Sequence, residues 1–267
     1  MIHPTAIIHP GAQIGPECVI GPYVVIDAQV VLGRGCRLGP QVYLTGHTEI
    51  GAGNVFHAGC VIGDAPQDLK YAQAPTRLRI GEGNTFREHA TVHRSTREDS
   101  DTIIGNGNLL MAGSHVGHNC VLGDSNIVAN GALLAGHATL ADRVFVSGNC
   151  LVHQFCRIGR LAMMQGSSGI SKDLPPFCIA RGANGIAGLN TVGLRRAGIT
   201  PEERLRLRRA YHLLFRSGLR RDDAVAAARD QVGDSPVALE LIEFVAAARR
   251  GVCADTGRRG VSDGEPE

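Results

Sequence analysis

The chain has 267 residues, with 27 Lys and Arg against 25 Asp and Glu, so its formal net charge is only +2. This near-neutral balance, without any basic run interleaved with aromatics, excludes a sequence-based argument for nucleic-acid binding. Hydrophobic residues make up 43% of the chain, aromatics make up 4% and Gly numbers 35, so we expect an aliphatic core and frequent turns rather than disorder.

The first residues, Met1-Ile2-His3-Pro4, have neither the charged start nor the continuous apolar stretch of a secretory signal peptide. No uncharged apolar run along the chain approaches the ~18 residues that a membrane-spanning helix needs. The sequence therefore predicts a soluble, cytoplasmic protein without a membrane span.

A large apolar residue recurs at every sixth position from Ile2 to Ile170. Of the 29 positions in this series, only Asp68, Ala74 and Glu98 are not large and apolar. A period of six is a multiple of the two-residue period of a strand and not of the helical period, so each hexad is expected to be a short strand followed by a bend. Gly commonly follows the apolar residue, and Ala or Cys commonly lies four positions after it.

This spacing resembles that of the hexapeptide-repeat family, whose fold is a left-handed parallel β-helix built from coils of three hexads. The resemblance implies an all-β β-helix over residues 1–174 and assembly into homotrimers. The hexad series is interrupted near 64–79 and near 94–103 but resumes in phase after both interruptions. We therefore expect two looped-out segments, which are common places for substrate contacts.

The eight cysteines fit the same pattern, because six of them occupy the small-residue position of a hexad. A thiol at this position would lie in the narrow interior of the β-helix. No CxxC pair is present, so we expect buried, reduced thiols rather than a metal site or a disulfide framework.

After the β-helix, a small helical domain is predicted over residues 175–250. Thr200-Pro201-Glu202-Glu203 is a capping box with proline at the first helical position, and the helix that it begins is expected to stop at Ser217-Gly218. Two further helices are expected, over 221–231 and from Pro236 to about Arg250.

The C-terminal part has two compositional features. Segment 194–221 carries nine Arg against two acidic residues. It is either a solvated helical surface in an arginine-biased chain or a dock for an acidic partner or for phosphates. Residues 251–267 contain little apolar sequence, which predicts a disordered tail.

Histidines are concentrated where chemistry is expected. If each coil has about 18 residues, His137 and His153 fall one position either side of the column through His118. An imidazole can act as a general base at neutral pH. No Ser or Cys lies in a nucleophile motif such as GxSxG, which favours direct transfer over a covalent enzyme intermediate. His115 and His118 have an H-x2-H spacing, unlike the H-x4-H of zinc-binding carbonic anhydrases on this scaffold, so no metal is expected.

Several longer motifs lie on and beyond the hexads. They are Gln67-Asp68-Leu69-Lys70-Tyr71, Thr91-Val92-His93-Arg94, Asn108-Leu109-Leu110-Met111, His115-Val116-Gly117-His118, Leu134-Ala135-Gly136-His137, Val152-His153-Gln154-Phe155 and Pro175-Pro176. Together they resemble the family of acyl-carrier-protein-dependent UDP-N-acetylglucosamine O-acyltransferases that begin lipid A synthesis. The resemblance implies transfer of a hydroxyacyl chain from acyl carrier protein to the 3-hydroxyl of the sugar. It implies no cofactor beyond the phosphopantetheine arm of the carrier protein.

The same resemblance implies roles for individual residues. His118 is expected to take the proton from the sugar hydroxyl, and the N–H of Gly136 is expected to stabilise the oxyanion. The resemblance assigns substrate contacts to Gln67, Asp68, Lys70, His115, His137, His153 and Gln154, uridine and diphosphate contacts to Asn190 and Arg196, and acyl-chain length to Met163 and Gly166. The glycine at 166 corresponds to the one that permits longer chains.

The chain departs from the family pattern at three positions. Asn119 stands where Asp frequently follows the base, Val192 where an acid is common, and Ala197 where a second arginine is common. Three alternatives remain open: an N-acyltransferase on an amino-sugar nucleotide, a 3-amino acceptor sugar, and a non-catalytic trimeric scaffold. The sister N-acyltransferases normally carry a uridine-binding domain ahead of the helix, whereas the hexads begin at Ile2 here.

Overall fold

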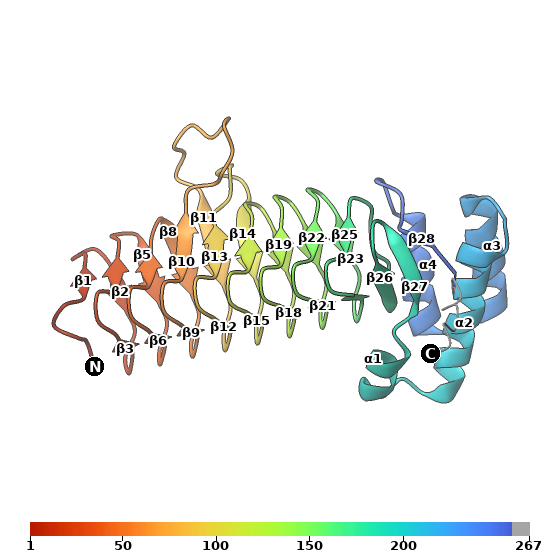
Figure 1. The fold of residues 1–267 in the computed structure, drawn as a ribbon, viewed down its shortest axis with the longest axis horizontal. Helices are drawn as coiled ribbons and strands as arrows, with labels where there is room; N and C mark the ends of the chain where they lie inside the picture. Colours follow the sequence, from red (N-terminus) through yellow and green to blue (C-terminus); the bar gives the residue numbers. More distant parts are fainter. Residues whose placement is uncertain (258–267) are drawn as a thin grey trace, which may run out of the picture.

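The structure, a computed structural model, describes residues 1–257 and shows a long rod with helices packed at one end (Figure 1). The rod is a left-handed parallel β-helix whose very short strands form three sheets, one on each side. Paired strands of successive coils lie 18 residues apart where no loop intervenes, as Val25 with Tyr43 and Leu133 with Leu151. The fold predicted from the hexads is confirmed.

Each of the three sheets is built from strands of successive coils, and the third sheet also includes β27 and β28 at the C-terminal end. The first sheet consists of β1 (Ile7–Ile8), β4 (Val25–Ile26), β7 (Tyr43–Leu44), β10 (Val61–Asp64), β13 (Thr91–His93), β16 (His115–Val116), β19 (Leu133–Leu134), β22 (Leu151–Val152) and β25 (Gly169–Ile170). The second consists of β2 (Gln13–Ile14), β5 (Val30–Leu32), β8 (His47–Ile50), β11 (Arg77–Ile80), β14 (Asp101–Ile104), β17 (Val121–Leu122), β20 (Thr139–Leu140) and β23 (Arg157–Ile158). The third consists of β3 (Val19–Ile20), β6 (Arg37–Leu38), β9 (Val55–Phe56), β12 (Thr85–Phe86), β15 (Leu109–Leu110), β18 (Ile127–Val128), β21 (Phe145–Val146), β24 (Met163–Met164), β26 (Cys178–Arg181), β27 (Gly185–Leu189) and β28 (Ala254–Asp255).

The interior of the rod is filled by the hexad residues. From Ile20 to Ile170, every large apolar residue of the series is at most 4% exposed. The cysteines are all buried, as predicted. Phe56 and Phe86 stack inside the rod with their ring centroids 4.7 Å apart. At the N-terminal end of the described rod, Ile2 is 55% exposed.

A row of buried asparagines follows one corner of the rod. The side-chain oxygen of Asn54 accepts the N–H of Asn84 at 2.9 Å, and that of Asn84 accepts the N–H of Asn108 at 2.8 Å. Asn108 accepts the N–H of Asn126 in the same way, and Asn126 accepts that of Val144, both at 2.8 Å. Each amide therefore satisfies a bend N–H of the next coil, which would otherwise be buried without a partner.

Two segments leave the β-helix, one between β10 and β11 and the other between β13 and β14. The longer loop, residues 65–76, projects from the rod at the top of Figure 1. The shorter loop, residues 94–100, is tied to it by Arg94, whose guanidinium donates to the carbonyl of Gly63 at 2.9 Å and lies over the Tyr71 ring at 5.6 Å. Both loops are shorter than the interruptions of the hexad series near 64–79 and 94–103, because flanking strands extend into these intervals.

The last coil is covered by a hairpin and four helices: α1 (Thr191–Arg196), α2 (Pro201–Arg216), α3 (Arg221–Val232) and α4 (Pro236–Ala246). β26 pairs in parallel with β24 and antiparallel with β27. The hydroxyl of Thr200 accepts the N–H of Glu203 at 3.2 Å, as the capping box predicts. The hairpin and α1 are not among the predicted elements, since the sequence predicted only helices after residue 175.

The end of the chain corrects two predictions. The last helix stops at Ala246 instead of continuing to about Arg250, whose side chain turns back and donates to the carbonyl of Ser171 at 3.3 Å. Residues 251–257 are structured rather than disordered, because β28 pairs with β27 and Asp255 pairs with Arg216 of α2. The rest of the predicted disordered tail, 258–267, lies outside the described residues.

The stacked phenylalanines test the stability of the interior. We expect Phe86→Ala to destabilise the fold by about 3–5 kcal/mol, because it empties a filled and rigid interior. Phe155→Ala is a matched control, since Phe155 is 51% exposed, and we expect it to cost about 1 kcal/mol or less. Denaturant unfolding followed by circular dichroism measures both. Equal losses for the two variants would contradict the stacked core.

Candidate active site

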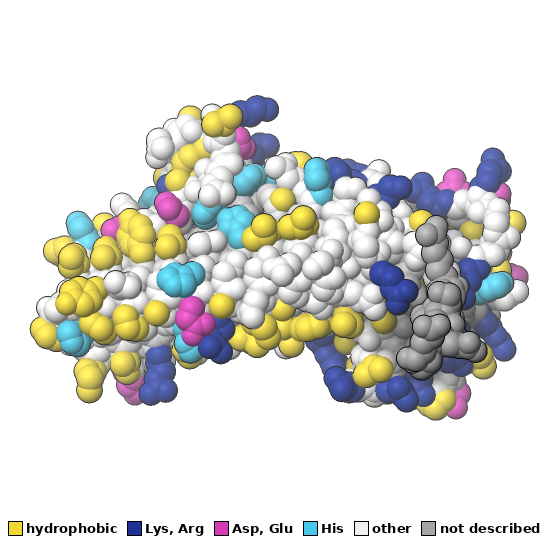
Figure 2. All heavy atoms as spheres, viewed as in Figure 1, with side chains coloured by type: hydrophobic (Ala, Val, Ile, Leu, Met, Phe, Trp, Pro, Cys, Tyr) yellow, Lys and Arg dark blue, Asp and Glu magenta, His cyan; other side chains and the backbone are white. Residues whose placement is uncertain are grey.

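A cleft with a volume of about 570 Å³ crosses the first sheet between β13 and β25. Figure 2 shows several histidine side chains gathered beneath the projecting loop, next to hydrophobic side chains. The polar lining of the cleft consists of Gln67, His93, His115, His118, His153 and Gln154, together with Ser171 and Asn184. Five of the residues predicted to contact substrate or to act as base therefore line one cavity.

His118 lies in the bend that follows β16 and is 8% exposed. Its Nδ1 is 2.9 Å from the side-chain oxygen of Asn119, and its ring lies edge-on to that of His137, with the ring centroids 5.2 Å apart. The imidazole is thus held by neighbours on two sides and open to the cleft on a third. This is the arrangement expected of a general base.

Gly136 lies one coil further along and forms the cleft wall against His118. A Cβ at this position would collide with the His118 ring, so only glycine allows the imidazole to approach the backbone so closely. Within residues 1–257, the N–H of Gly136 donates no hydrogen bond. A free N–H in a cleft wall, next to an imidazole, is available to an anionic oxygen.

Burial favours the neutral form of three histidines near His118, namely His93, His115 and His137. Burial, with a smaller contribution from His93 and His118, lowers the pKa of His115 to about 4, and the Nδ1 of His115 lies 2.8 Å from the Thr91 hydroxyl. Burial also lowers the pKa of His93 and that of His137 from the usual value. At neutral pH, His93 and His115 therefore offer the cleft uncharged imidazoles, which can donate or accept hydrogen bonds to sugar hydroxyls.

The structure does not bring every predicted residue into the cleft. His137 faces the neighbouring hollow that contains Arg97 and Asn119, and its ring stacks on Phe155 at 4.5 Å. Asp68 and Lys70 lie on the projecting loop, where Asp68 accepts the N–H of Lys70 at 2.9 Å. Asp68 is nevertheless near enough to act electrostatically on His137.

Four other predicted residues lie outside the cleft of their own chain. Asn190 caps α1 by accepting the N–H of Gly193 at 2.9 Å, and Arg196 is exposed on the last turn of that helix. Met163 belongs to the third sheet rather than the first, and Gly166 lies in the bend between the third and first sheets. Their predicted roles in substrate binding therefore stay predictions.

Sequence reasoning missed the apolar floor of the cleft. His115, Leu133, Leu151 and Gly169 follow one another at intervals of 18 residues and pair in register across β16, β19, β22 and β25. Leu133 is 42% exposed and Leu151 is 54% exposed, so both present apolar surface to the cleft. The signal was in the sequence, because the same 18-residue count that groups the histidines also predicts this column.

The comparisons with known proteins point to one family. A family model described as Udp N-acetylglucosamine O-acyltransferase, Domain 2, matches residues 173–253, and a model of bacterial transferase hexapeptide repeats matches 101–136. The acyl-[acyl-carrier-protein]–UDP-N-acetylglucosamine O-acyltransferase of Thermodesulfovibrio yellowstonii is 44% identical over 94% of this chain and 98% of its own. The protein of that name from Agrobacterium fabrum is 41% identical over 92% of both chains.

The chain belongs to this acyltransferase family. Solved structures agree: a UDP-N-acetylglucosamine acyltransferase from Bacteroides fragilis superimposes with a TM-score of 0.90 at 40% identity, covering 94% of this chain and 99% of the other. A related structure from Acinetobacter baumannii gives a TM-score of 0.91 at 40% identity, covering 94% and 98%. The family resemblance found in the sequence is confirmed, and the protein is an acyltransferase.

Two further properties of the described chain bear on its chemistry. Within residues 1–257, no group of three His, Cys, Asp or Glu side chains is placed to hold a metal ion. Over the same residues, no helix has the length and apolar character to cross a membrane.

The buried imidazole of His115 predicts a pH dependence of stability. Its pKa is lowered from 6.5 to about 4 on folding, so the unfolded chain binds a proton that the folded chain does not. The free energy of unfolding should therefore fall as the pH drops from 6.5 towards 4, by on the order of 2 kcal/mol for this partly screened group.

This dependence can be measured by denaturant unfolding between about pH 7 and about pH 4.5. His115→Gln should show a smaller loss of stability than the unaltered chain over this range. His212→Gln, at an exposed position of α2, is the control and should leave the dependence unchanged. Identical curves for all three proteins would contradict the buried neutral imidazole.

Proposed function

We propose that this protein transfers a 3-hydroxyacyl chain from acyl carrier protein to the 3-hydroxyl of UDP-N-acetylglucosamine, in lipid A biosynthesis. The observation that carries the proposal is the close approach of His118 to the glycine wall at 136, inside a cleft that His93, His115 and His153 also line. The two substrates proposed are those that appear in the names of the related proteins. The acyl group arrives on the phosphopantetheine arm of the carrier protein, so the reaction needs no cofactor of its own.

The mechanism requires one base and one oxyanion donor. The Nε2 of His118 takes the proton of the sugar hydroxyl as the oxygen attacks the thioester carbonyl. The oxyanion of the tetrahedral intermediate accepts the free N–H of Gly136, a contact often worth about 10²–10³ in rate. The intermediate then collapses, the C–S bond breaks, and the proton passes from the imidazolium to the leaving sulfur.

The other residues of the cleft would bind the two substrates. Gln67, His115 and His153 can hydrogen-bond sugar hydroxyls, and the column of Leu133 and Leu151 can bind the acyl chain. Burying each methylene contributes about 0.8 kcal/mol, so a floor of this kind favours a long chain.

We further propose a homotrimer, in which a neighbouring copy completes the site. Asn190 and Arg196 lie beyond the end of the β-helix and away from the cleft of their own chain. They can hold uridine and diphosphate, as the resemblance implies, only where another copy presents α1 to the cleft. A guanidinium suits the geometry of phosphate oxygens.

The base assignment is tested by His118→Ala. We expect kcat to fall by about 10²–10⁴, because the imidazole acts in the transition state, while the fold and the assembly state are kept. Product formation from UDP-N-acetylglucosamine and an acyl carrier protein thioester measures the rate. Activity that survives in His118→Ala would refute the assignment of His118 as the base. Activity that is lost with a chelator and restored by zinc would indicate a metal-dependent mechanism instead.

Acyl-chain length is tested with a panel of thioesters, and mass spectrometry of the product also identifies the acceptor atom. A Cβ at Gly166 would meet only the carbonyl of Gly148, at 3.7 Å, so Gly166→Met should fold. We expect the variant to prefer shorter chains. If the site loses room for about four methylenes, its specificity for the longer donor should fall roughly a hundredfold. An unchanged ranking of donors would remove Gly166 from the acyl site.

The arginine-rich helix α2 is our proposed docking surface for the acidic carrier protein. Arg209, His212, Arg216 and Arg220 recur at spacings of 3, 4 and 4, which on one continuous helix would place them on one face. In the structure α2 ends at Arg216, and Arg220 precedes α3. Arg216 pairs with Asp255 and Arg220 with Asp223, whereas the exposed Arg209 makes no ion pair within residues 1–257. Arg209 is therefore the position at which charge reversal acts on docking rather than on the fold.

We expect Arg209→Glu to raise the KM for the acylated carrier protein several-fold at low salt and to leave the KM for the sugar nucleotide unchanged. The difference should shrink as salt is added, because exposed charges are screened. Arg37→Glu, on an exposed position of the N-terminal coils, is the control. A change that does not respond to salt would assign the arginines to the solvated surface.

A further inference from the structure

The shorter loop, residues 94–100, contacts the residue next to the proposed base. The side-chain oxygen of Asn119 accepts the N–H of Thr96 at 3.1 Å and its hydroxyl at 2.9 Å. The side-chain NH₂ of Asn119 donates to the Ser100 hydroxyl at 2.8 Å, and its backbone N–H donates to the Thr102 hydroxyl at 2.7 Å. Asn119 is 7% exposed, and its side chain is thus held in one orientation by the loop.

These contacts determine which nitrogen of His118 carries the proton. A backbone N–H can only donate, so the atom of Asn119 that receives the N–H of Thr96 is the oxygen. The same oxygen lies 2.9 Å from the Nδ1 of His118, which must therefore donate to it. A neutral imidazole with its proton on Nδ1 has its lone pair on Nε2, where a base needs it.

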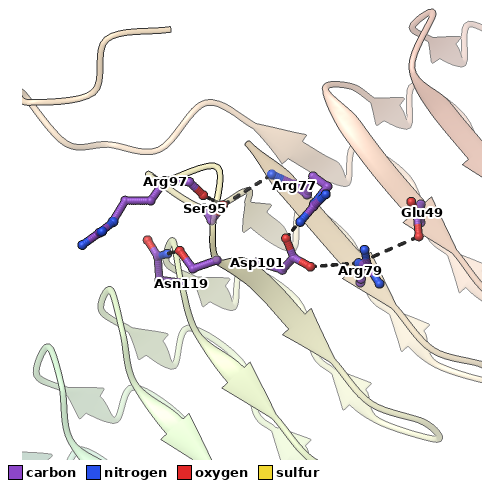
Figure 3. Close-up of polar contacts among 8 residues, drawn as sticks. Glu49, Arg77, Arg79, Ser95, Arg97, Asp101 and Asn119 are labelled. Carbon is purple, nitrogen blue, oxygen red and sulfur yellow. Dashed lines mark hydrogen bonds and ion pairs between the residues drawn. The ribbon is translucent and has the colours of Figure 1, made fainter. Parts of the chain in front are cut away.

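The loop is itself anchored to the second sheet (Figure 3). The N–H of Ser95 donates to the carbonyl of Arg77 at 3.1 Å, and the N–H of Arg77 donates to the Ser95 hydroxyl at 3.3 Å. Asp101 accepts from the guanidinium groups of Arg77 and Arg79, each at 2.8 Å. The side chain that holds the base is therefore connected to β11 and β14 and not only to its own bend.

We propose that Asn119, held by the 94–100 loop, is the positioning residue that fixes the tautomer and orientation of His118 without adding a negative charge. This inference rests on the proposed role of His118 as base. It assigns a function to the shorter loop, namely to orient the imidazole. It also implies that, among residues 1–257, the imidazolium formed during turnover has no carboxylate as its direct partner.

A substitution at position 119 leaves the other titratable groups around His118 in place. His93 on β13, His115 on β16 and His137 after β19 face it, and Asp68 acts on His137. Charged groups on the far side of Asn119 line the adjacent hollow: Arg97, Asp99 and Asp101. A charge introduced at 119 is therefore the only new one next to the ring.

The first test is Asn119→Asp, which keeps an oxygen against Nδ1 and adds a negative charge. A carboxylate favours the imidazolium, so the acid limb of the kcat/KM profile should move to higher pH, by about one unit or more. On the plateau above this limb, kcat should stay within about tenfold of the unaltered enzyme. An acid limb that stays in place would overturn the inference.

The second test asks whether Thr96 acts through Asn119. Asn119→Ala should lower kcat by about tenfold or more with little change in the KM for the sugar nucleotide, and Thr96→Val should lower it by a few-fold. In the double variant the Thr96 effect should vanish, because its partner is gone. Independent, multiplicative effects would show that the loop does not work through Asn119.

A matched control tests whether replacing any asparagine in the left-handed backbone conformation has the same effect. Asn149 has the same left-handed conformation as Asn119, with φ of 55° against 59°, but it is exposed on another coil. Asn149→Ala should leave kcat and the pH profile unchanged. If the unaltered protein transfers no acyl group, the proposed function fails; if it does and Asn149→Ala loses as much kcat as Asn119→Ala, only the positioning role fails.

Discussion

The hydrogen bonds between successive coils hold every other feature of this protein in place. The N–H groups of Ile7, Val25 and Tyr43 donate to carbonyls of the next coil at 2.8, 3.0 and 2.9 Å. A slip of one residue in this pairing would turn the apolar side chains outwards, so the filled interior fixes the register. Side chains one coil apart must therefore lie one above another, and the active site is assembled from such columns.

One column shows how this constraint serves chemistry. Asn119, His137 and Phe155 occupy the same corner of three coils, and each has a positive φ, of 59°, 61° and 64°. This conformation costs a side-chain-bearing residue on the order of 1 kcal/mol, which the stacked coils on either side sustain. The shared backbone conformation directs the three side chains the same way. The amide of Asn119 contacts His118, the ring of His137 packs edge-on against that of His118, and the ring of Phe155 stacks on that of His137.

Periodicity explains what the sequence could predict and what it could not. The hexads predicted the coil, and counting in coils placed His118, His153 and Gln154 in one cleft. The hairpin, α1 and β28 carry no period and depend on distant partners, such as Arg216 with Asp255. The orientation of Asn119 was hidden for the same reason, since its partners lie in a loop that has left the repeat. Asn190 was assigned to the nucleotide from resemblance alone, and the structure adds that it caps a helix.

The buried cysteines have a consequence for how the rod comes apart. Burial raises the pKa of Cys60 to about 11 and that of Cys120 to about 12, so neither thiol reacts while its coil is closed. In a stack where each coil touches only its neighbours, opening proceeds from an uncovered end. Thiols placed along the axis from Cys18 to Cys156 are then natural markers of position, and the order in which they become alkylated records the direction in which the coils separate.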